Sequence, residues 1–202
     1  MEIIKTPVRF STSHPIADVE IKNKPLDAYG RLDYQKGEIC VAGFFTDNGI
    51  TQFVLKNEPK IEEFKRGVND FLGTINEKNL HAFNMNMETG CFTKLLGRSP
   101  KIHEIKPFNG RGTTKEYFFT YLLKKKIEDP DSACFDDPLN GRSDLCPEYW
   151  QRGLFEDVRK HNLCCLTKEA KILKHRDFIL KEFSPLIDRN GWLNSGASLP
   201  LI

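Results

Sequence analysis

The sequence contains no apolar run near the roughly 20 residues that a membrane-spanning helix needs, so we expect no membrane association. Its opening, MEIIKTPVRFSTSHP, lacks the basic-then-apolar order of a secretion signal, which favours a cytoplasmic location. None of the six cysteines forms a C-x-x-C pair, so a zinc ribbon is not predicted. The net charge is only +2, and any nucleic-acid site must therefore be a local basic patch.

The chain is long enough, at 202 residues, for one domain with a sizeable core. We find no internal repeat, no low-complexity segment and no linker that would divide it. The sequence therefore predicts a single domain over residues 1–202.

Strand and helix patterns alternate along the chain. An Asn-Gly turn between 38–45 and 50–55 predicts a hairpin, and 146–180 predicts a short helix, a break at Gly153 and a long helix. The other expected elements are an edge strand or loose arm (1–13), strands in 15–21, 79–84 and 101–112, and helices in 58–75, 87–97 and 113–126. This order predicts an α/β fold with a mixed sheet and helices on its faces.

Two carboxylates interrupt the first apolar strand, PIADVEI. Asp18 and Glu20 are two residues apart, so in a strand they point to the same face. Two like charges on a core face are unfavourable unless something positive lies between them. A pair of solvated acids on an exposed strand is the simpler alternative.

Further polar side chains stand at a strand end and on the last long helix. Glu88 follows HAFNMN, where a strand leads into a helix, although the helix dipole alone also favours an acid there. Asp157, His161 and Cys165 follow i, i+4, i+8 spacing and share one helix face. These positions can converge at the carboxyl edge of one sheet, where ligands of α/β proteins bind.

The D-x-E strand, the hairpin, the FNMNME junction and the late helix with HN resemble RNase H-like 3′–5′ exonucleases of the DEDD type, from about residue 15 to about 175. The resemblance implies a three-layer fold with a mixed five-stranded sheet and helices on both faces, followed by a C-terminal tail over 176–202. It also implies hydrolysis of phosphodiester bonds at the ends of single-stranded DNA or RNA. Mg²⁺ or Mn²⁺ would be the cofactor.

The same resemblance assigns the site. Asp18, Glu20 and Glu88 would be catalytic metal ligands, and His161 would orient or deprotonate the attacking water. Cys165 stands where the family has its fourth acid, and a thiol is a poor ligand for Mg²⁺. Asp157, one turn before His161, is a candidate replacement for that acid.

The segment KPFNGRGTTKEYFF suggests contacts with nucleic acid. Lys106, Arg111 and Lys115 surround two glycines ahead of a helix, where basic groups and backbone N–H groups can hold phosphates. Phe108 could stack on a base. The alternative is a capped helix after a turn, with Phe108 buried in the core.

Two other functions stay open at this point. The departure at Cys165 allows an inactive nuclease-fold protein that serves as a nucleic-acid-binding or protein-interaction module. A thiol-dependent enzyme built on Cys165 and His161 is the other alternative.

Overall fold

The computed structural model describes residues 1–75, 79–110, 112–128, 136–194 and 199. Its strands form one open mixed sheet in the order β1-β4-β3-β2-β5-β6. The strands are β1 (Glu2–Thr6), β2 (Ile16–Ile21), β3 (Ile39–Thr46), β4 (Gly49–Val54), β5 (Leu80–Ala82) and β6 (Ile102–Glu104). The first four strands in this order, β1, β4, β3 and β2, pair antiparallel with their neighbours. β5 runs parallel to β2, and β6 runs parallel to β5.

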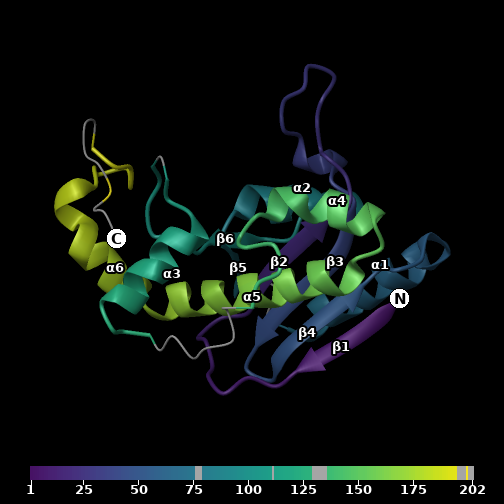
Figure 1. The fold of residues 1–202 in the computed structure, drawn as a ribbon, viewed down its shortest axis with the longest axis horizontal. Coiled ribbons are helices and arrows are strands. Elements are labelled where there is room, and N and C mark those ends of the chain that lie inside the picture. The colour runs from purple at the N-terminus through teal and green to yellow at the C-terminus, as the bar shows by residue number, and fades with distance from the viewer. Residues whose placement is uncertain (76–78, 111, 129–135, 195–198, 200–202) are drawn as a thin grey trace.

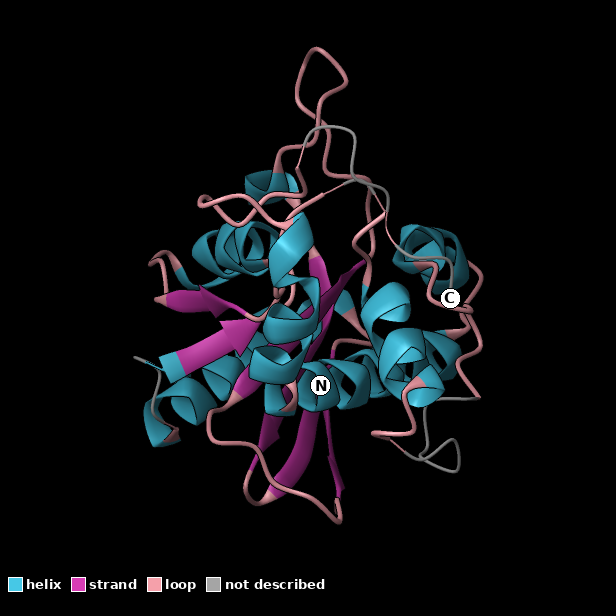
Figure 2. Ribbon diagram, turned by 90° about the vertical axis from the view of Figure 1, so that its left-hand side faces the viewer, coloured by secondary structure: helices cyan, strands magenta, loops and turns pink. Residues whose placement is uncertain are grey.

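Helices cover both faces of the sheet (Figures 1 and 2). The α-helices are α1 (Ile61–Thr74), α2 (Met85–Leu96), α3 (Lys115–Lys124), α4 (Cys146–Gln151), α5 (Phe155–Lys174) and α6 (Arg176–Phe183). Short 3-10 turns are η1 (Tyr34–Lys36), η2 (Glu58–Lys60), η4 (Ser143–Leu145) and η5 (Ser184–Leu186). The α/β class with helices on both faces is confirmed, and no helix within the described ranges is long and apolar enough to cross a membrane.

The predicted number of strands was wrong: the sheet has six, not five. The sixth is β1, which pairs with the edge of the hairpin in the register Glu2↔Val54 to Thr6↔Ile50. Of the two possibilities for the N-terminal segment, the edge strand is the one observed. The hairpin of β3 and β4 leaves a free edge that a short extended segment can pair with.

The predicted helix breaks are partly as expected. Gly153 separates α4 from α5 with a φ of 77°, a backbone conformation that glycine adopts without a Cβ clash. The long helix was expected to continue through residue 180, but it ends at Lys174, and α6 follows after His175. Thr114 caps α3 by accepting a hydrogen bond from the Tyr117 N–H at 3.1 Å.

The two faces of β2 carry different side chains. Ala17, Val19 and Ile21 pack on the α1 and α2 side with Phe64 and Phe92. The alternate residues, including both acids, face α5, which crosses the strands in Figure 1. Alternation along a strand of period two therefore gives one apolar face and one face that carries Asp18 and Glu20.

Gly43 lets α5 approach the sheet beside the acids. It pairs with Asp18 across the β2–β3 ladder. A Cβ at this position would lie 2.6 Å from Leu166 Cδ1 and closer still to Asn162 Oδ1. The side chains of α5 consequently reach the backbone of the central strands.

Candidate functional site

Asp18 is held by side chains from two helices. Its Oδ1 accepts a hydrogen bond from the Lys115 ammonium at 2.9 Å, and its Oδ2 accepts one from Asn162 Nδ2 at 2.8 Å. Asn162 is fixed in turn because its Oδ1 accepts a hydrogen bond from Gln52 Nε2 at 2.8 Å. Burial raises the pKa of Asp18, but the charge and hydrogen bond of Lys115, a hydrogen bond with Glu169 and the charge of His161 together outweigh it, so the pKa lies below its usual value.

Glu169 is the acid of α5 that meets Asp18. It is fully buried, and its Oε1 accepts a hydrogen bond from the same Lys115 ammonium at 2.7 Å. Burial holds the pKa of Glu169 well above its usual value, although the Lys115 charge acts in the opposite direction. The positive group required between the acids is therefore Lys115, which lies against Asp18 and Glu169 rather than against Glu20.

Glu88 completes this part of the site from the first turn of α2. β5 runs parallel to β2 with His81 opposite Ile16, and α2 begins three residues after the end of β5. The Glu88 side chain is buried, and burial together with the charges of Asp18 and Glu169 holds its pKa well above its usual value. Among the residues that the structure describes, Glu88 Oε2 and Glu169 Oε2 are buried without a hydrogen-bond partner.

Glu20 points to a second group of side chains. Its Oε2 accepts a hydrogen bond from the Cys146 thiol at 3.1 Å, and its Oε1 lies 3.8 Å from His161 Nε2. Burial and the Asp18 charge raise the pKa of Glu20 to about 8. Glu20 can therefore bind a cation together with Asp18, or together with the Cys146 thiol and the His161 imidazole.

His161 is buried and fixed from both sides of its ring. Its Nδ1 lies 2.8 Å from Asp137 Oδ1, and its Nε2 lies 2.9 Å from Ser143 Oγ and 3.6 Å from Cys165 Sγ. Burial lowers the pKa of His161, but the hydrogen bond to Asp137 and the charge of Glu20 raise it above its usual value. The described part of the polar segment before α4 thus supplies two partners of the histidine.

The structure brings together most of the residues predicted for the site. Asp18, Glu20 and Cys165 have ligand atoms within 4.8 Å of one another, as do Glu20, Cys146 and His161. Asp157 stands apart from both groups. It lies partly exposed in the first turn of α5, about 12 Å along the helix axis from Cys165.

Sequence reasoning missed Glu169, although a signal for it was present. The i, i+4, i+8 series of Asp157, His161 and Cys165 continues with Glu169 at i+12, one turn beyond the cysteine. Buried neighbours on that turn, including Ala170, mark it as an inward-facing part of the helix.

The residues predicted to contact nucleic acid have different positions. Lys115 is 15% exposed and bonded to the acids. Phe108 is only 2% exposed and packs against Phe118 and Phe183, as the capped-helix alternative expected. Lys106 is partly exposed with its ammonium 5.8 Å from the centre of the Phe83 ring, and Arg111 lies outside the described residues.

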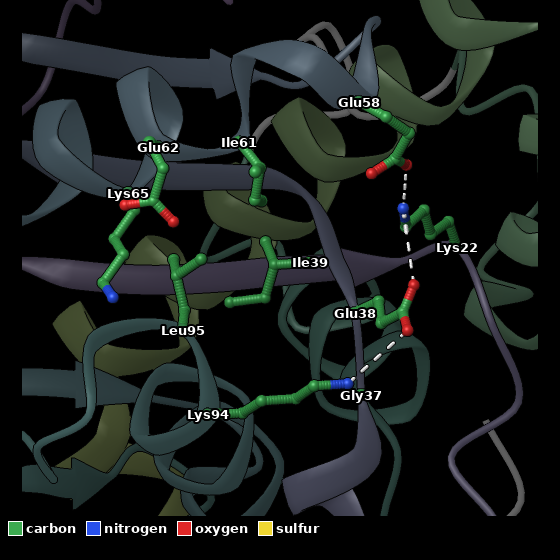
Figure 3. Close-up of a pocket in the computed structure, with 10 residues that line it drawn as sticks. All are labelled: Lys22, Gly37, Glu38, Ile39, Glu58, Ile61, Glu62, Lys65, Lys94 and Leu95. Carbon is green, nitrogen blue, oxygen red and sulfur yellow. Dashed lines mark hydrogen bonds and ion pairs between the residues drawn. The ribbon is translucent and has the colours of Figure 1, made fainter.

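A surface cavity of about 350 Å³ lies away from these residues, between the start of β3, α1 and α2 (Figure 3). Lys22 pairs there with Glu58 and Glu38, and Lys94 pairs with Glu38 at 3.6 Å. None of the predicted site residues lines it. Because these charges already neutralise one another, we place the candidate site at the buried acids instead.

The chain was compared with protein-family models, with curated proteins and with solved structures, and none of the three comparisons gives a match.

Proposed function

We propose that the protein is a divalent-metal-dependent phosphodiesterase of the RNase H-like type that shortens single-stranded DNA or RNA from the 3′ end. The observation that carries the proposal is the buried group of acids around Lys115. The Lys115 ammonium bonds both Asp18 and Glu169, the charges of these two acids act on Glu88, and Glu20 has a ligand atom within 4.8 Å of Asp18. Five of the six strands, β2 to β6, lie side by side in the mixed sheet with helices on both faces, which supports the fold part of the proposal.

The residues present fit a hard divalent cation. Carboxylate oxygens are the ligands that Mg²⁺ and Mn²⁺ prefer, and three acids come from three different elements. Buried polar atoms without a partner are rare, yet both Glu88 and Glu169 have one. A bound cation would satisfy both oxygens and would favour the ionised form of acids whose pKa values burial raises.

The chemistry that the metal supplies is activation of a water and stabilisation of the leaving oxygen. The protein positions the ligands: Asn162 orients Asp18, while α5 and α2 present Glu169 and Glu88. His161 is held against Glu20 by Asp137, so we assign it to positioning Glu20.

Lys115 is well placed to change partners. It is more exposed than Asp18 or Glu169, its two carboxylate partners. With a divalent ion bound to those acids, the Lys115 ammonium would be free to pair with a substrate phosphate. Lys115, which the sequence predicted to hold a phosphate, would then do so from its position beside Asp18 and Glu169.

Removal and return of metal tests this proposal. We expect protein treated with chelator to leave 5′-labelled single strands intact, and millimolar Mg²⁺ or Mn²⁺ to restore progressive shortening. Calorimetry on the same metal-free protein should detect binding of the ion. Shortening that continues in excess chelator, or shortening from the 5′ end of a 3′-labelled strand, would contradict the assignment.

A second function is favoured by the two ion pairs that Lys115 makes with Asp18 and Glu169. A lysine that neutralises the acids permanently would leave a nuclease-fold protein that binds nucleic acid and does not cut it. In that case salt-sensitive binding persists in chelator, and calorimetry shows no Mg²⁺ or Mn²⁺ binding.

A further inference from the structure

Four potential ligands of a softer metal meet beside the acids. They are Glu20 of β2, Cys146 at the start of α4, and His161 and Cys165 of α5. All four are between 0 and 2% exposed. Two thiols and an imidazole suit zinc and are unsuited to Mg²⁺, so this group differs in chemistry from Asp18, Glu88 and Glu169.

Three contacts among the four side chains have lengths near those found between the ligand atoms of a tetrahedral zinc site. Ordinary zinc bond lengths place neighbouring ligand atoms about 3.4–3.8 Å apart. Cys146 Sγ lies 3.1 Å from Glu20 Oε2, His161 Nε2 lies 3.8 Å from Glu20 Oε1, and Cys165 Sγ lies 3.6 Å from His161 Nε2. Glu20, Cys146 and His161 have ligand atoms within 4.8 Å of one another, and Cys165 adjoins them through His161 and Glu20. Binding of all four to one ion requires rotation of the side chains.

The hydrogen bond on the far side of the imidazole is a second, independent observation. Metal-binding histidines usually donate their other ring N–H to a carboxylate, which fixes the tautomer. His161 Nδ1 lies 2.8 Å from Asp137 Oδ1, and Asp137 is itself held by the backbone N–H groups of Leu139 and Gly141. With the proton on Nδ1, Nε2 can accept a hydrogen bond from Ser143 Oγ at 2.9 Å, and Cys165 Sγ and Glu20 Oε1 lie 3.6 and 3.8 Å from it. Zinc at Nε2 would replace the Ser143 hydroxyl.

We propose that Glu20, Cys146, His161 and Cys165 form a buried structural zinc site with Asp137 as the partner of the histidine. The site ties α4 to β2 and α5 and has no open ligand position. It engages Glu20 while leaving Asp18, Glu88 and Glu169 to the hard cation, and it does not depend on the proposed hydrolysis.

The test uses the full-length protein with zinc and cobalt as probes. We expect about one zinc per chain after loading and dialysis. Cobalt in the same site should give a thiolate-to-cobalt charge-transfer band. Both the zinc stoichiometry and the cobalt band are measured on the wild-type protein and need no variant.

Variants identify the ligands. Cys146→Ser should weaken zinc binding by at least about 100-fold, and Asp137→Asn by about 10- to 100-fold. Cys91→Ser, at a buried cysteine on the opposite face, should leave it unchanged. Glu88→Gln should remove Mn²⁺ binding but retain zinc, which separates this site from the proposed hydrolytic one.

Two results would overturn the zinc site. One is wild-type protein that takes up no zinc on loading and dialysis. The other is zinc uptake that Cys146→Ser leaves intact and that gives no thiolate band with cobalt.

Discussion

Cleavage of single strands is expected to fall by at least about 1,000-fold when Asp18 is replaced by asparagine or Glu169 by glutamine. Each change keeps the shape of the side chain but removes a charged metal ligand. A loss of that size corresponds to about 4 kcal/mol of transition-state stabilisation. Rates measured at saturating Mn²⁺, together with Mn²⁺ affinities from calorimetry, provide the check.

Asp157→Asn is the matched control for these two variants. Asp157 lies on the same helix as Glu169 but in its first turn, partly exposed and apart from the acids. We expect its cleavage rate to stay within about twofold of the wild type, as is usual for surface substitutions. If Asp157→Asn lost cleavage while Glu169→Gln kept it, the fourth ligand would be Asp157 and the geometry described here would not be the working one.

Replacing Lys115 by methionine is expected to destabilise the metal-free protein by about 3 kcal/mol or more. The ammonium is the bonded cation of Asp18 and Glu169, and removing one partner of a buried ion pair leaves an uncompensated charge. Mn²⁺ should restore much of this loss, because a ligand present at 100 times its Kd adds about 2.7 kcal/mol. Urea unfolding with and without Mn²⁺ measures both effects.

Lys106→Met is the matched control, because it removes one positive charge at a residue that does not contact Asp18 or Glu169. Lys106 is partly exposed and lies over the Phe83 ring, so we expect a loss of about 1 kcal/mol or less, without dependence on Mn²⁺. Mn²⁺ should also bind Lys115→Met more tightly than the wild type, since the ammonium no longer competes. Equal destabilisation of both variants, with no rescue by metal, would show that Lys115 does not occupy a cation position.

Local patterns were enough to predict much of the fold. The Asn-Gly turn between two β-rich runs predicted the hairpin of β3 and β4, and threonine before the aromatic-rich segment predicted the start of α3. These features depend on contacts between residues close in sequence. For residues 1–13 the local pattern left an edge strand and a loose arm open, and pairing with β4 decides between them. The break at His175 was not predicted.

The candidate site likewise has features that the sequence predicted and features that it did not. The shared face of Asp18 and Glu20 follows from the period of a strand, so the sequence alone predicted it. The contact of Lys115 with Asp18 joins residues 97 positions apart, and that of His161 with Asp137 joins residues 24 apart. No short motif encodes such contacts, which is why Lys115 was expected at a phosphate rather than among the acids.

Diffraction from crystals soaked in Mn²⁺, recorded for anomalous scattering, tests the central claim most directly. We predict an anomalous peak within ligand distance of the Asp18, Glu88 and Glu169 carboxylates, with the Lys115 ammonium moved away from Asp18. A site without a peak, with Lys115 still bonded to Asp18 and Glu169 at millimolar Mn²⁺, would contradict a metal-dependent phosphodiesterase.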